Sequence, residues 1–311
     1  MYCQFYGLSA LPFSLNPDPG VFFPGARYTV ANTILEYAVL RREGVLVITG
    51  EVGCGKTILI RHFLDHGGRE SCIGVISNPS TLRGAPLTAI LLAFNQHVSS
   101  GEGALLHASL RAFLDAQHAQ GRPTVLIVDE AQNLPLETLE ELRMLTNPEV
   151  NGNGTLQLVL VGQPELQQLL YRPDFSQLLQ RVVAHYHLQP MDQAETAEYV
   201  AHRLRLAGRA KALFTPAALA RIFQGARGVP RLVNMICDAA LLYGYTEEMQ
   251  QIDADVIAQV VLDRGLAGGE PAPSPFDPAA SAPRPSMPPL ETLTPDLEMA
   301  GQFGGGTKKL R

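Results

Sequence analysis

One octapeptide constrains the fold of this chain more than any other segment. It reads Gly50-Glu51-Val52-Gly53-Cys54-Gly55-Lys56-Thr57 and matches the pattern G-x-x-x-x-G-K-[ST]. Residues 45–49 before it are apolar and β-branched, which predicts a strand, and residues 57–66 after it predict a helix. In a strand-loop-helix unit of this kind, backbone N–H groups and the positive end of the helix face bound phosphates. The octapeptide therefore predicts a phosphate-binding loop.

The loop indicates a site for ATP with Mg²⁺. We expect Lys56 to contact the β- and γ-phosphates and Thr57 to bind Mg²⁺. Every residue from Gly50 to Thr57, together with Ile58, is a candidate nucleotide contact. For Cys54, a small side chain that fills a loop position is a better interpretation than a reactive thiol.

A second motif supplies carboxylates. The run Val125-Leu126-Ile127-Val128-Asp129-Glu130 is an apolar strand that ends in two acids. Because the carboxyl ends of parallel strands meet at one edge of a sheet, both acids should lie beside the phosphate loop. We expect Asp129 to support Mg²⁺ and Glu130 to polarise the attacking water as general base. The two motifs together predict hydrolysis of ATP.

The pattern of apolar runs predicts an α/β fold. Further strands are expected at residues 72–77, 125–128, 156–161 and 184–188, and helices at residues 29–42, 57–66, 86–97, 104–120 and 136–146. Alternation of strands and helices indicates βαβ crossovers and a mainly parallel sheet with helices on both faces, in three αβα layers. After Pro190 the strand signal stops, and residues 193–207, 216–224, 231–243 and 254–263 predict a small all-helical domain.

These patterns divide the chain into four parts. Residues 1–27 are rich in aromatics and prolines and should dock on the nucleotide-binding domain, which we expect at residues 28–190. The all-helical domain is expected at residues 191–265. Residues 266–311, where prolines concentrate between Pro271 and Pro295, should form a disordered tail.

Composition narrows the classes of function. No apolar run approaches the roughly 20 residues that cross a bilayer, and the first Lys or Arg is Arg27, which argues against a signal peptide. The formal net charge is −6, which disfavours nucleic acid as the main partner. The 4 cysteines lie far apart and predict free thiols. We therefore expect a cytoplasmic protein.

Several segments resemble one family of ATPases. They are Phe5-Tyr6-Gly7-Leu8, Pro12-Phe13-Ser14-Leu15-Asn16-Pro17-Asp18-Pro19, Asp129-Glu130-Ala131-Gln132-Asn133-Leu134, Leu145-Thr146-Asn147, Gly162-Gln163-Pro164-Glu165-Leu166 and Gly228-Val229-Pro230-Arg231-Leu232-Val233-Asn234. Between about residues 2 and 262 the chain resembles the general secretion pathway protein A ATPases, and more closely the ATPase of mannose-sensitive haemagglutinin pilus biogenesis.

The resemblance implies an AAA+ module with a helical lid that works as a homo-oligomer, for example a ring. It implies a partner in the inner membrane and a role in assembling a pilus, a type II secretion system or a polysaccharide export system. It also assigns three residues: Gln163 as the sensor-one residue, Arg181 as an arginine finger for the neighbouring subunit, and Arg231 as sensor two. Family members often continue into a transmembrane segment and a cell-wall-binding domain, whereas a Pro-rich tail is expected here.

Two alternatives stay open at this point. A DNA-linked AAA+ regulator, such as a transposition target selector or a helicase loader, shares these modules, although the net acidity counts against it. The second alternative is a nucleotide switch that binds ATP without turnover. The presence of Glu130 and Arg181 counts against this alternative. For the adenine, Phe13 and Tyr28 are candidate contacts, with core packing as the competing role.

Overall fold

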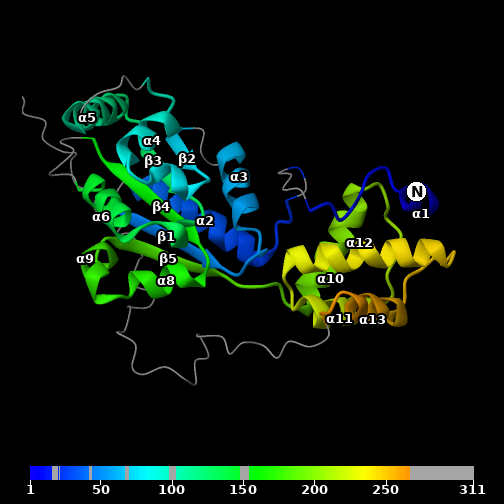
Figure 1. The fold of residues 1–311 in the computed structure, drawn as a ribbon. Helices are drawn as coiled ribbons and strands as arrows, with labels where there is room; N and C mark the ends of the chain where they lie inside the picture. Colours follow the sequence, from blue (N-terminus) through cyan, green and yellow to red (C-terminus); the bar gives the residue numbers. More distant parts are fainter. Residues whose placement is uncertain are drawn as a thin grey trace, which may run out of the picture. The chain divides into compact units, whose positions relative to one another are not determined.

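The computed structural model describes residues 1–15, 20, 22–41, 44–66, 70–97, 103–147 and 154–266 (Figure 1). Apart from Leu266, the predicted tail lies outside the described residues. Within the described residues, no helix is both long enough and apolar enough to span a bilayer.

A parallel sheet organises the first part of the chain. Its strands are β1 (Val45–Gly50), β2 (Cys72–Ile76), β3 (Thr124–Val128), β4 (Leu156–Gly162) and β5 (Val182–Leu188). They form a 5-stranded sheet in the order β2-β3-β4-β1-β5, and every neighbouring pair is parallel. The predicted α/β fold with a parallel sheet is therefore confirmed.

Helices cover both faces of this sheet. They are α2 (Ala26–Arg41), α3 (Lys56–His66), α4 (Pro86–Ala93), α5 (Gly103–Ala119), α6 (Leu136–Leu145), α8 (Pro164–Leu170) and α9 (Ser176–Leu179), with 3₁₀ turns η2 (Pro79–Leu82), η3 (Ala131–Asn133) and η4 (Pro173–Phe175). Alternate residues of β1 face opposite sides: Leu46 and Ile48 pack with α2 and α3, whereas Val45 and Val47 pack with α4, α5 and α6. Burial on both faces explains why the strands are continuous apolar runs.

Four helices follow the sheet. They are α10 (Gln193–Leu206), α11 (Pro216–Ala226), α12 (Pro230–Thr246) and α13 (Ala254–Asp263), which we call the lid helices. Three of them begin at side-chain caps: Asp192 accepts from the Glu195 N–H, Thr215 from the Ala218 N–H, and Asp253 from the Val256 N–H. The lid helices enclose an apolar cluster of their own that includes Ile222 and Ile236.

The N-terminal segment packs differently from the expectation. Its short helix α1 (Tyr2–Tyr6) and Phe13 lie in the cluster of the lid helices, where Phe13 contacts Phe214 with ring centroids 6.1 Å apart. The buried Arg203 of α10 donates to the carbonyls of Pro12 and Ser14. Residues 1–15 are thus bound to the lid helices, whereas Phe22 and Tyr28 pack beside the sheet.

Helix α5 allows a matched test of the core. Leu110 is 1% exposed and Leu105 is 64% exposed on the same helix. We expect Leu110→Ala to lower the free energy of unfolding by about 2–5 kcal/mol because it opens a cavity against the sheet. Leu105→Ala should change it by less than about 0.5 kcal/mol. Urea unfolding of the two variants measures the difference, and equal losses would contradict this packing.

Candidate functional site

The phosphate loop connects β1 to α3 at the carboxyl edge of the sheet. Lys56, the first residue of α3, is 6% exposed, and its ammonium donates to the carbonyl of Gly50 at 2.6 Å and to that of Glu51 at 3.0 Å. These contacts hold the ammonium group of Lys56 within the loop, in the position where it can contact a bound phosphate.

Gly53 brings the loop against α12. Its φ of +83° is a conformation that L side chains rarely adopt, and a Cβ there would lie 2.7 Å from the Cβ of Arg231. The Arg231 N–H donates to the Gly53 carbonyl at 3.3 Å. Upstream, the Met191 N–H donates to the Gly228 carbonyl at 2.9 Å, which fixes the turn before α12. The structure thus places Arg231 beside the phosphate loop.

Thr57 and Asp129 meet at this loop. The Thr57 hydroxyl donates to Asp129 Oδ2 at 2.9 Å, and the Glu130 N–H donates to Asp129 Oδ1 at 2.9 Å. Burial raises the pKa of Asp129, and these two hydrogen bonds oppose the rise. A hydroxyl and a carboxylate in contact are the oxygen ligands that Mg²⁺ prefers, so the donor set fits this ion.

The carboxylate of Glu130 accepts hydrogen bonds from the side-chain amides of two glutamines. The Glu130 backbone has φ 55° and ψ 35°, and Oε2 accepts from Gln163 Nε2 at 3.3 Å and from Gln132 Nε2 at 2.6 Å. Gln163 follows β4, the strand beside β3, as the sequence indicated. Gln132 was missed as a site residue, although it stands two positions after Glu130 within the quoted motif.

Arg181 lies beside the start of β1, away from the phosphate loop. Its carbonyl accepts from the N–H of Val45, the first residue of β1, and its Nη1 donates to the Thr146 carbonyl at 3.2 Å. The phosphate loop begins at the other end of β1, and a strand of 6 residues spans about 20 Å. Arg181 is therefore too far from the phosphate loop of its own chain to contact a nucleotide there.

Tyr28 supports the loop from the N-terminal side. Its hydroxyl donates to the carbonyl of Cys54, and burial raises its pKa. Burial also raises the pKa of the Cys54 thiol to about 11, which keeps the thiol protonated at neutral pH. Of the two candidate adenine contacts, Tyr28 lies at the loop and Phe13 lies among the lid helices.

Two histidines of β5 lie beside the end of β1, the strand that enters the phosphate loop. The hydroxyl of the buried Thr49 lies 3.0 Å from Nε2 of His185 and 2.9 Å from Nδ1 of His187, both on β5. Burial lowers the pKa of both imidazoles. No sequence motif marks this cluster, because it forms only when β5 pairs with β1.

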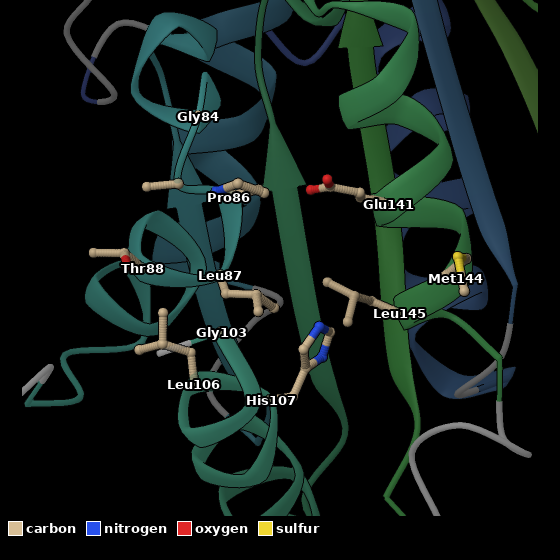
Figure 2. A pocket seen from close by; sticks show the side chains of 11 residues that line it. Gly84, Pro86, Leu87, Thr88, Gly103, Leu106, His107, Glu141, Met144 and Leu145 are labelled. Atoms are coloured by element: carbon tan, nitrogen blue, oxygen red, sulfur yellow. The ribbon is translucent and has the colours of Figure 1, made fainter. Parts of the chain in front are cut away.

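A separate pocket of about 510 Å³ lies between α4, α5 and α6. Figure 2 shows Leu87 and Leu106 on one side, with Glu141, Met144 and Leu145 of α6 on the other. None of the predicted nucleotide-site residues lines it. This pocket and the phosphate loop are therefore distinct features.

Sequence comparison gives one family model and one relative. Residues 39–170 match a family model described as an AAA domain. General secretion pathway protein A of Aeromonas hydrophila is 41% identical over 253 residues, which are 81% of this chain and 46% of that protein. The chain thus spans about half the length of this curated relative.

Solved structures share the fold at low identity. The ORC2 protein of Aeropyrum pernix, in ADPNP-ADP complexes, has a TM-score of 0.59 with 19% identity, over 83% of this chain and 72% of that one. Cdc6p of Pyrobaculum aerophilum has a TM-score of 0.58 with 16% identity, over 76% of this chain and 68% of that one. The RuvB branch migration motor of Thermotoga maritima has a TM-score of 0.51 with 18% identity, over 77% of this chain and 69% of that one. At these identities the likeness concerns the fold.

The histidine pair on β5 predicts a pH dependence of stability. Because the folded chain lowers the pKa of His185 and His187 below the usual value, it binds fewer protons than the unfolded chain as the pH falls. The stabilisation is present above the unfolded pKa of about 6.5 and is lost as pH falls through the folded values. The double variant His185→Gln, His187→Gln should therefore lose less stability than the parent between pH 7.5 and 5.5.

Urea unfolding at the two pH values measures this difference. His118→Gln, at an exposed position on α5, controls for the loss of an imidazole. The pKa of His62 and of His202 is also lowered by burial, so the pH dependence should shrink without vanishing. An unchanged pH dependence in the double variant would contradict the assignment.

Proposed function

We propose, from the premise that this chain is an AAA-type P-loop ATPase, that its ATP turnover drives assembly or remodelling of a bacterial envelope machine. The observation that carries the enzymatic part is the meeting of three groups at one sheet edge. They are the loop lysine Lys56, the hydrogen-bonded pair Thr57 and Asp129, and the amide-bound carboxylate of Glu130.

Each group has a defined task in phosphoryl transfer to water. Lys56 binds the phosphate oxygens and balances their charge, while Thr57 and Asp129 would hold Mg²⁺. That ion supplies further neutralisation of the charge on the β- and γ-phosphates. Glu130 accepts a hydrogen bond from the attacking water and takes its proton, and the Gln163 amide orients this carboxylate.

Arg231 links the nucleotide to the lid helices. Its backbone contacts the phosphate loop and its side chain is exposed, so the guanidinium is available to a γ-phosphate. In this proposal the contact forms with ATP and weakens after hydrolysis, which changes the position of α12. Hydrolysis is then coupled to movement of the lid helices.

Arg181 acts on a neighbouring copy. It lies at the amino edge of the sheet, far from its own phosphate loop, and its exposure is intermediate. An arginine that serves the site of the next subunit requires a homo-oligomer, and a ring satisfies every site in turn. The guanidinium of the neighbouring subunit then completes the charge stabilisation of the transition state.

The cellular task rests on the sequence relatives. The 41% identity to General secretion pathway protein A of Aeromonas hydrophila supports work for a secretion system, and the quoted motifs support a pilus system as the narrower choice. The partner in this proposal is an inner-membrane component of that machine. Turnover needs a compartment that contains ATP, which places the chain in the cytoplasm in this proposal.

DNA-linked work is the competing function. The fold resembles ORC2, Cdc6p and RuvB structures, but that likeness concerns the fold alone. The net charge of −6 opposes binding to phosphate backbones. Turnover with and without duplex DNA at moderate salt decides between the two. Strong stimulation accompanied by a gel shift would overturn the assembly proposal.

Glu130→Gln tests the general base. The amide keeps the size of the side chain but cannot take a proton, so turnover should fall by about 100-fold or more. Binding of ATP with magnesium should persist, because Lys56 and Thr57 are unchanged. Steady-state hydrolysis and equilibrium binding measure the two effects, with Glu137→Gln in the first turn of α6 as control. Full turnover in Glu130→Gln would remove this residue from the mechanism.

Arg181→Ala tests action across subunits. Turnover should fall by about 1,000-fold while nucleotide binding persists. A mixture with Lys56→Ala should recover turnover, because one copy supplies the intact loop and the other supplies the arginine. Arg172→Ala, which removes an exposed ion pair with Asp174, is the control. Loss of turnover in Arg181→Ala without recovery on mixing would exclude the role in trans.

A further inference from the structure

Gln132 joins the two segments that end at the hydrolysis site. Its Oε1 accepts from the backbone N–H of Gln163 at 3.0 Å, and its Nε2 donates to Glu130 Oε2 at 2.6 Å. The backbone N–H can only donate, so it determines which end of the amide is the oxygen. The NH₂ end must therefore face the carboxylate of Glu130.

The anchor of this amide is a rigid part of the fold. The Gln163 N–H follows directly on β4, which is buried along its whole length between β3 and β1. Gly162, the last residue of β4, leaves room for the amide, since a Cβ there would lie 2.7 Å from Gln132 Oε1. Because Gly162 has no side chain, the Gln132 amide fits where β4 ends.

The backbone of Glu130 needs such support. A non-glycine residue at φ 55° is in the left-handed region, which costs on the order of 1–2 kcal/mol. The side chain leaves the backbone just before η3, a turn of 3 residues. Gln132 and Gln163 both donate to Oε2, so among the residues that the structure describes Oε1 is the oxygen left to accept from water.

We propose that Gln132 is a positioning residue for ATP hydrolysis, which fixes the Glu130 carboxylate to the end of β4 and presents Oε1 to the attacking water. This inference rests on the proposed function, in which Glu130 is the general base. Gln132 itself contacts neither the nucleotide nor the ion in this role. It acts by limiting the rotation of Glu130, because a base displaced by about 1 Å loses much of its effect.

Two substitutions separate the anchor from the contact with Glu130. Gln132→Met keeps the approximate length of the side chain and removes both hydrogen bonds. Gln132→Glu keeps an acceptor for the Gln163 N–H but faces Glu130 with an oxygen that cannot donate. Gln168→Met, at an exposed position on α8, is the matched control. Hydrolysis is measured with the full chain, and ATP binding and urea unfolding are measured on the same samples.

The expected result is a loss in kcat without a loss of binding. Both Gln132 variants should lower kcat by about tenfold with KM for ATP within about twofold, because the interaction serves the base and not the nucleotide. Gln168→Met should match the parent. In a Glu130→Ala background, Gln132→Met should cause no further loss, since the group that it positions is absent.

Other outcomes overturn the inference. If Gln132→Met raises kcat, the contact restrains Glu130 in an inactive position. If kcat is unchanged, or if the loss is as large in the Glu130→Ala background, Gln132 does not act through Glu130. If Glu130→Gln leaves turnover intact, the proposed function fails first. If Glu130→Gln abolishes turnover and Gln132→Met does not lower it, only the positioning role fails.

Discussion

The site depends on a hydrogen bond between two residues, Thr57 and Asp129, that follow strands which are not neighbours in the sheet. Thr57 lies in the first turn of α3, the helix after β1, whereas Asp129 follows β3, and β4 lies between these strands. The register aligns Val47 of β1, Leu160 of β4 and Val128 of β3 at one level, where β3 ends, while β4 continues to Gly162 and β1 to Gly50. This alignment brings the Thr57 hydroxyl to Asp129 and also places Gln163, after β4, beside Glu130. A shift in the register of β4 would separate Thr57 from Asp129 and Gln163 from Glu130.

The same geometry explains which elements the sequence predicted well. β1 and β4 are buried at every position, so they are continuous apolar runs, and their predicted bounds are confirmed to within one residue. β5 is an edge strand with exposed positions, which weakened its signal, and it begins at Val182, two residues before the predicted start. Helix α4 ends at Ala93, short of the predicted residue 97, because Asn95 adopts a positive φ of 56°. The phosphate loop and the acidic pair were predictable because each lies in one contiguous motif.

Features made by distant segments were not predictable from one sequence. The role of Gln132 depends on the backbone N–H of Gln163, which is 31 positions away. The contact of Thr49 with His185 depends on strand pairing across 136 positions. The aromatics of residues 1–15 indicated burial correctly, but apolar side chains do not specify which apolar surface they will meet. Polar contacts such as those of Arg203 with the Pro12 carbonyl and of Arg209 with the Tyr6 carbonyl favour the lid helices, and no local sequence pattern predicts them.

The phosphate loop receives support from both ends of the described chain. Tyr28 donates to the Cys54 carbonyl from the N-terminal side, and the Arg231 N–H donates to the Gly53 carbonyl from α12. The segment before Tyr28 is itself bound to α10, since His202 contacts the Phe22 carbonyl and Phe23 packs against Tyr199. Displacement of the lid helices would therefore pull on adjacent carbonyls of the loop by two routes, one through Arg231 and one through Tyr28. Because these carbonyls belong to residues that closely precede Lys56, both routes end at the lysine that the proposed function assigns to the phosphates.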